Sequence, residues 1–175
     1  MNARIATAVV RFRLDVNFGA PVTPAPRTVG LPSLRPDTAA VRVLGYPIET
    51  VLAEKLATAI MLGAANTRVR DYADIYTLTG RHDLTMGVIR AALDATARFR
   101  GVEIAPLSSV VDDLVELRER TYRAYRTGPA WRRWPRLPSD FGEVVEAVTT
   151  FADPLARPTA EPRWHAADRR WTAAT

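Results

Sequence analysis

The chain has 175 residues, 47% of them hydrophobic, and its 24 basic and 19 acidic side chains give a formal net charge of +5. This length and composition allow a buried core in one domain and exclude a low-complexity tail. The absence of cysteine excludes disulfide bridges and cysteine-based metal sites, and no apolar run approaches the roughly 18 residues of a membrane span. We therefore expect a cytoplasmic protein that does not bind a membrane, and its positive charge favours a polyanionic partner such as nucleic acid.

The first predicted element is a half-buried strand over residues 10–18, where apolar and polar side chains alternate. Its apolar positions are Val10, Phe12, Leu14, Val16 and Phe18, and its polar positions are Arg11, Arg13, Asp15 and Asn17. Residues 19–36 contain five prolines and two glycines, which predicts an extended, turn-rich connection. Residues 42–44 are expected to form a short extended segment.

A helix is predicted over residues 47–62, because Pro47 is tolerated in the first turn and Gly63 is a common terminator. Its apolar arc is formed by Leu52, Leu56, Ala59, Ile60 and Gly63. Glu49 and Lys55 fall within or at the edge of this arc, whereas Glu54 and Thr58 are expected to point away. A buried ion without a partner costs several kcal/mol, so Glu49 and Lys55 need partners.

Lys55 is the only lysine among the 24 basic residues; the other 23 are arginines. An ammonium group is a compact point charge that commonly binds phosphate, whereas a guanidinium group is a planar fork. A compositional preference for arginine explains the count equally well. The position of Lys55 in the fold must therefore decide between chance and a functional role. Its place beside the apolar arc favours either a chemical role or a structural ion pair.

A second helix is predicted over residues 68–78, with Thr67 as its cap. Asp71 and Asp74 are three residues apart and so share one face of this helix. Two carboxylates this close repel each other unless a cation compensates, and the candidates are Arg68, Arg70, Lys55 or a metal ion. The alternative is a solvated acidic pair that is balanced by the local arginines alone.

Three more helices are predicted over residues 85–99, 108–126 and 140–151, where apolar side chains recur at helical spacing. Arginines are concentrated over residues 118–136, which fits either a nucleic-acid surface or solvated helix faces. Trp131 and Trp134 lie in the same stretch and either stack on bases or belong to the core.

Three segments of the sequence together resemble the AbiEii/AbiGii-type nucleotidyltransferase toxins. They run from Asp15 to Pro24, from Tyr46 to Leu56, and from Arg70 to Tyr76, in the order and with gaps similar to those of the family. The resemblance implies the polymerase-β-like nucleotidyltransferase superfamily and the toxin of a bacterial toxin–antitoxin or abortive-infection pair. Such enzymes transfer a nucleoside monophosphate from a nucleoside triphosphate (NTP) to an acceptor. In relatives of the mycobacterial MenT type, the acceptor is the 3′ end of tRNA.

The resemblance also implies roles for individual residues. Asp15 corresponds to the third carboxylate of the Mg²⁺-binding set, and Lys55 to the lysine that binds the triphosphate together with Arg68 and Arg70. Asp71 and Asp74 correspond to the paired acids of the last motif. Glu49 is expected to orient Lys55 or the strand from behind the site. The implied partners are an NTP, RNA (tRNA in particular) and a cognate antitoxin protein.

The family's first motif, a Gly-Ser turn followed by an Asp-x-Asp strand, does not occur in this sequence, since no glycine is followed by Gly or Ser. We therefore expect an α+β fold in which residues 1–46 form a remnant of the nucleotidyltransferase sheet. Residues 47–153 are expected to form a mainly helical bundle, and residues 154–175 a partly ordered tail in which Trp164 and Trp171 pack back. A single metal-binding carboxylate predicts poor transfer or none by this chain.

Two other hypotheses remain. The chain is alternatively a non-catalytic, arginine-rich helical module that binds RNA or an antitoxin protein, or a remnant without function. The apolar side of the expected strand over residues 10–18 would be exposed in a partial sheet, which favours self-association.

Overall fold

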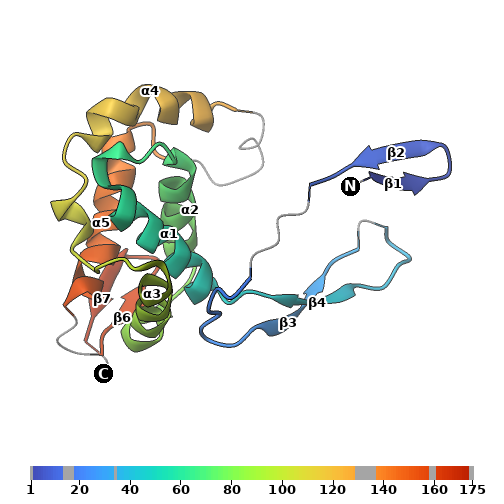
Figure 1. Cartoon of the computed structure of the whole chain (residues 1–175), viewed down its shortest axis with the longest axis horizontal. Helices are drawn as coiled ribbons and strands as arrows, with labels where there is room; N and C mark the ends of the chain where they lie inside the picture. The colour runs from blue at the N-terminus through green and yellow to red at the C-terminus, as the bar shows by residue number, and fades with distance from the viewer. Residues whose placement is uncertain (1, 14–17, 34, 129–136, 158–160, 174–175) are drawn as a thin grey trace.

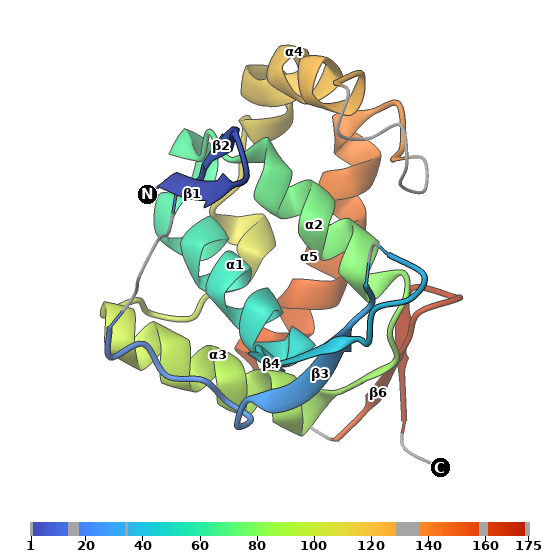
Figure 2. The same cartoon turned by 90° about the vertical axis from the view of Figure 1, so that its right-hand side faces the viewer.

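The computed structural model describes residues 2–13, 18–33, 35–128, 137–157 and 161–173. Two small β-hairpins at the N-terminus project to one side of a helical bundle (Figure 1). In the view of Figure 2, these hairpins lie in front of the bundle and α5 lies behind. The architecture confirms the α+β prediction. In the part of the chain that is described, no helix has the length and apolar character needed to cross a membrane.

The N-terminal strands form two separate antiparallel pairs. β1 (Asn2–Ile5) pairs with β2 (Ala8–Arg11), and β3 (Arg27–Leu31) pairs with β4 (Val41–Gly45). The short segment expected over residues 42–44 is confirmed by β4. β3 was not expected, because prolines dominate residues 19–36; it fits in the proline-free interval between Pro26 and Pro32, which contains β-branched side chains.

The prediction of a half-buried strand over residues 10–18 is wrong in two respects. β2 ends at Arg11, and all four of its residues are exposed, because it pairs only with β1. Phe18 is 84% exposed and lies outside any strand. Residues 14–17, which include Leu14, Asp15, Val16 and Asn17, lie outside the described residues. Alternating apolar and polar residues therefore suggest a strand, but they do not show whether another layer of the protein covers its apolar face.

α1 (Ile48–Leu62) confirms the predicted helix and lies at the centre of the bundle. It is more completely buried than expected: Thr58, which was expected to point away, is 7% exposed because α3 (Met86–Arg100) covers that side. The Arg100 Nη1 donates to the hydroxyl of Thr58 at 2.7 Å and to the carbonyl of Glu54 at 3.2 Å. A helix that is apolar on most sides is typical of a core helix.

The connection from α1 to α2 is tight. Gly63 has φ 50°, and a Cβ atom there would lie 2.6 Å from the carbonyl oxygen of Val110, so glycine is required. The 3-10 helix η1 (Gly63–Ala65) leads to α2 (Val69–Thr79). The N-cap of α2 is Arg68 rather than the expected Thr67, and no side chain caps this helix. Asn66 stabilises the turn before it, because the Asn66 Oδ1 accepts from the backbone N–H of Arg68 at 2.8 Å.

The remaining helices pack around α1 and α2. The helix predicted over residues 108–126 is divided into a 3-10 turn, η2 (Leu107–Ser109), and α4 (Leu114–Arg126), because Asp113 adopts φ 63°. α5 (Phe141–Ala156) begins where expected and continues past residue 151, with Pro154 in its last turn. Phe141 joins these helices in the core, since its ring stacks on Tyr122 at 4.8 Å and meets Tyr72 edge-on at 5.8 Å.

The end of the described chain closes the bundle with a small sheet. β5 (Leu84–Thr85), β6 (Arg163–His165) and β7 (Arg170–Thr172) form three antiparallel strands. Trp164 is fully buried, and its indole N–H donates to the Thr79 carbonyl at 2.7 Å. Trp171 stacks on Phe151 at 5.3 Å. The prediction that both tryptophans pack back against the bundle is confirmed.

Candidate functional site

The single lysine lies between two carboxylates. Lys55 projects from α1, and its Nζ lies 2.7 Å from Asp71 Oδ1 and 2.8 Å from Asp74 Oδ2, both on α2. The three-residue spacing places both acids on the face of α2 that is turned to Lys55. The side chains are only 20%, 15% and 24% exposed. The structure therefore brings Lys55, Asp71 and Asp74 together, and among the candidates that the sequence left open Lys55 is the cation that binds both carboxylates.

The protonated state of Lys55 is set by two opposing effects. Burial favours the neutral amine and lowers the pKa, whereas the hydrogen bonds and charges of Asp71 and Asp74 raise it, and the net pKa lies above its ordinary value. Lys55 is therefore a stable ammonium ion at neutral pH. An ammonium has three N–H donors, and the two aspartates occupy two of them. One donor stays available to a ligand.

Two arginines flank the same cluster. Arg68 Nη1 lies 4.0 Å from Asp71 Oδ2, and Arg70 Nε lies 3.7 Å from Asp74 Oδ2. Both side chains are well exposed, at 65% and 75%, and such long contacts at the surface contribute little stability. The arginines can therefore turn towards an incoming anion at small cost.

These residues surround a pocket of about 370 Å³ at the start of α2. It is lined by Lys55, Thr67, Arg68, Val69, Arg70, Asp71 and Asp74. The N-terminal end of a helix carries a partial positive charge, which adds to the three cationic side chains. Three cations against two carboxylates leave a net positive pocket, which is suited to a phosphate-bearing ligand.

The other predicted site residues are not part of this cluster in the described structure. Asp15 lies outside the described residues, so its role as a metal ligand stays a prediction. Glu49 is partly buried in the first turn of α1, and the acids that contact Lys55 come from α2 instead. The orienting role expected of Glu49 also stays a prediction.

Magnesium does not fit the described residues by themselves. No group of three or more histidine, aspartate or glutamate side chains that could hold a metal ion occurs among them. The two carboxylates that lie together, Asp71 and Asp74, both bind the ammonium of Lys55. Any Mg²⁺ site would therefore need carboxylates beyond those that the structure describes, such as Asp15.

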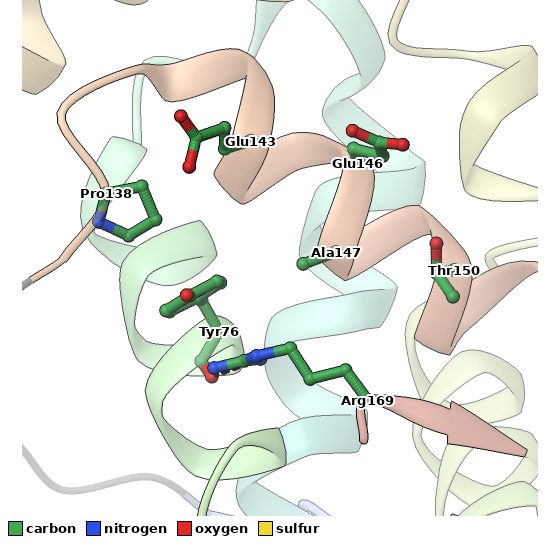
Figure 3. A pocket seen from close by; sticks show the side chains of 7 residues that line it. All are labelled: Tyr76, Pro138, Glu143, Glu146, Ala147, Thr150 and Arg169. Carbon is green, nitrogen blue, oxygen red and sulfur yellow. Dashed lines mark hydrogen bonds between the residues drawn. The ribbon is translucent and has the colours of Figure 1, made fainter. Parts of the chain in front are cut away.

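A second pocket, of about 310 Å³, lies between α2 and α5 (Figure 3). The guanidinium of Arg169 lies 3.7 Å from the centre of the Tyr76 ring and donates to the Tyr76 carbonyl at 3.0 Å. Glu143 and Glu146 line it from α5. The sequence did not indicate this pocket, because Arg169 is 93 residues from Tyr76 in the chain. Its contacts attach the β6–β7 turn to α2.

The arginine-rich stretch over residues 118–136 is partly used for packing. Arg118 Nε donates to the Asn66 carbonyl at 2.8 Å, and Arg123 Nε donates to Glu119 at 2.7 Å. Trp131 and Trp134 lie outside the described residues, so their predicted stacking stays untested. In the described part of this stretch, the structure thus supports the interpretation of a helix face more than that of an open basic patch.

The α+β fold is the one expected for the class of protein that the sequence suggested, a nucleotidyltransferase-type toxin. A family model described as "Nucleotidyl transferase AbiEii toxin, Type IV TA system" matches residues 1–168. The chain therefore belongs to the AbiEii nucleotidyl transferase toxin family, the toxin component of a toxin–antitoxin system. No curated protein and no solved structure matches the chain.

Proposed function

We propose that this protein is a toxin that transfers a nucleoside monophosphate from an NTP to an RNA acceptor, such as the 3′ end of tRNA. The observation that carries the proposal is the position of Lys55, which is fixed by Asp71 and Asp74 at a pocket that also contains Arg68 and Arg70. The family to which the chain belongs supports the reaction class.

The arrangement suits a triphosphate for electrostatic reasons. In nucleotidyl transfer, a hydroxyl oxygen of the acceptor attacks the α-phosphorus, and the bond to the bridging oxygen breaks to release pyrophosphate. Negative charge builds on the phosphate oxygens and the leaving group, so a positioned cation stabilises the transition state. The remaining N–H donor of Lys55 would contact a phosphate oxygen, and Arg68 and Arg70 would contact the others.

Asp71 and Asp74 would act on Lys55 in this proposal. They keep the amine protonated and restrict the rotation of its long side chain, so that less conformational entropy is lost when the nucleotide binds. The requirement for Mg²⁺, with Asp15 as a ligand, stays a prediction. Because the described residues gather only two carboxylates and both bind Lys55, we expect slow turnover.

The alternative function is a non-catalytic module that binds RNA or an antitoxin protein. It is favoured by one observation: the arginines of the N-terminal strands have no ion-pair partner among the described residues. The two functions differ in what Lys55 does. RNA binding by a module should not change when Lys55 is replaced, whereas nucleotide transfer should be lost.

The test is incubation of the whole chain with bulk tRNA, Mg²⁺ and each of the four NTPs, labelled at the α-phosphate. We expect label at the tRNA 3′ end in low yield with at least one NTP, and loss of that label in Lys55→Met. Arg98→Met is the control, because Arg98 is an exposed cation in the last turn of α3 and does not line the Lys55 pocket. No label with any NTP, or equal label in Lys55→Met, would contradict the proposal.

A further inference from the structure

The two N-terminal hairpins form an arm, which we define as residues 2–13, 18–33 and 35–46. The arm leaves the bundle just before α1 and extends on the side of α1 and α2 (Figures 1 and 2). Lys55 and its pocket are built from these same two helices. The arm thus extends beside the two helices that carry the pocket.

The charged side chains of the described arm are almost all positive. Its six cationic side chains are Arg4, Arg11, Arg13, Arg27, Arg35 and Arg42, and all are exposed. Asp37 is the only carboxylate that the structure describes in the arm. None of the six guanidinium groups has an ion pair or a side-chain hydrogen bond among the described residues. An array of unpaired guanidinium groups attracts a polyanion.

The arginines of the bundle behave differently. Arg100 donates to Thr58, Arg118 to the backbone of Asn66, and Arg123 to Glu119. These arginines hold helices together or pair with acids on their own helix. The high arginine content of the chain therefore does not by itself explain the unpaired arginines of the arm, because many arginines of the bundle do have hydrogen-bond or ion-pair partners.

The arm also exposes aromatic rings. Phe18 is 84% exposed and Tyr46 is 52% exposed. Stacking of unpaired bases on aromatic rings beside a basic surface is the usual mode of single-stranded nucleic-acid binding. A-form duplexes offer few base faces for stacking, so these rings favour a single strand or an unpaired end.

A second copy of the chain is the competing occupant. Val29, Leu31 and Val41 share one exposed face of the β3–β4 hairpin, and such a face can pack against protein. However, two arms in contact would bring two sets of unpaired arginines together. The charge of the arm therefore favours RNA over self-association.

We propose that the arm binds the single-stranded end of an RNA acceptor and leads it towards the Lys55 pocket. The choice of RNA as the polyanion rests on the proposed function, whereas the location of the surface rests on the arm alone. Arginine side chains would neutralise phosphates, and Phe18 and Tyr46 would stack on bases.

The experiment measures binding of the whole chain to a fluorescent single-stranded RNA of about 12 nucleotides and to bulk tRNA, over a range of salt concentrations. The arm variant carries Arg11→Gln, Arg27→Gln and Arg42→Gln. The matched control carries Arg120→Gln, Arg157→Gln and Arg163→Gln, three exposed residues of the bundle that change the net charge equally. Circular dichroism confirms that the helical content of both variants is retained.

We expect the arm variant to bind at least tenfold more weakly than the control variant at low salt. The slope of log affinity against log salt should fall by about 2, because each lost phosphate contact contributes about 0.7 for single strands. Equal loss in both variants, or no loss in the arm variant, would overturn the proposal. It would also be overturned by arm-dependent dimers in sedimentation together with unchanged RNA affinity.

Lys55→Met separates this proposal from the proposed function. If the arm variant binds RNA more weakly than the control and Lys55→Met binds it normally, while no protein transfers nucleotide, the arm proposal holds and the catalytic one fails. If the wild-type chain transfers nucleotide and the arm variant binds RNA as tightly as the control, the arm proposal fails alone.

Discussion

Lys55 on α1 and Asp71 on α2 are joined by a hydrogen-bonded ion pair of 2.7 Å, and Asp74 completes the cluster at 2.8 Å. The three residues therefore connect two central helices of the bundle. The charges depend on one another, because the ammonium of Lys55 offsets the repulsion between the two neighbouring carboxylates. The cluster thus has a structural role as well as the proposed chemical one, and the two can be separated by experiment.

Replacement of Lys55 by methionine should lower the free energy of unfolding by about 1–3 kcal/mol, because Asp71 and Asp74 are then partly buried without a cation. Urea denaturation followed by circular dichroism measures the effect. Since the pKa of Lys55 is raised, its contribution should be constant from neutral pH to about pH 10 and be lost only above the ordinary lysine value.

A double-mutant cycle tests whether the pair itself is responsible. Asp71→Asn in the wild-type chain should be destabilising, whereas the same change in Lys55→Met should be less costly or even stabilising, because it removes one of two repelling carboxylates. Equal effects of Asp71→Asn in both backgrounds would show that Lys55 and Asp71 are not coupled.

Two buried tyrosines should ionise only when the protein unfolds. Burial raises the pKa of Tyr72 and of Tyr122, whose side chains are at most 1% exposed. Below the ordinary tyrosine pKa of about 10, their contribution to stability is fully present; as pH rises further, the unfolded state ionises first and stability falls. Absorbance at 295 nm should therefore show a late step that coincides with loss of helical circular dichroism. Complete ionisation in a folded chain would contradict this.

Gly63 should tolerate alanine less well than Gly101 does. Both have positive φ, at 50° and 65°, but only at Gly63 would a Cβ atom meet the backbone of Val110, at 2.6 Å. Gly101→Ala should cost about 1 kcal/mol for its backbone conformation, and Gly63→Ala roughly 1–3 kcal/mol more, because two segments must move apart. Thermal unfolding of the two variants compares them directly, and equal melting temperatures would contradict the steric account.

Trp164 should hold the C-terminal strands on the bundle. Trp164→Phe keeps an aromatic ring in the core but removes the donor to the Thr79 carbonyl, and should cost about 1–3 kcal/mol. Trp164→Ala also leaves a cavity and should cost about 3–5 kcal/mol. Chemical denaturation gives both values. Trp171 is only partly buried, so Trp171→Phe should lower the free energy of unfolding less than Trp164→Phe does. Equal losses of stability in the two variants would contradict this account.

The sequence predicted the helices better than the strands, for physical reasons. Helices such as α1 carry local signals in their apolar spacing and in the glycine that ends them. The burial of β2 depends on whether another layer covers it, which alternation does not reveal. The break before α4 depends on the left-handed conformation of Asp113, and the start of α2 at Arg68 depends on the Asn66 turn that follows Gly63.

The sequence also indicated only part of the candidate site. Asp71 and Asp74 could be assigned to one face from their spacing, and Lys55 to the edge of a buried arc, so their contact followed once α1 and α2 were adjacent. The contact of Arg169 with Tyr76 could not be predicted, because it joins segments far apart in the chain. The functional roles of Asp15 and Glu49 stay predictions.

The central claim is that Lys55 binds the phosphates of a nucleotide, and direct NTP binding tests it without requiring turnover. Isothermal titration calorimetry with each NTP should give binding that is at least tenfold weaker in Lys55→Met than in the wild-type chain, since the variant loses the ammonium donor. Arg98→Met, with the same loss of one positive charge, should bind like the wild-type chain. Equal NTP affinity in Lys55→Met and in the wild-type chain would contradict the account.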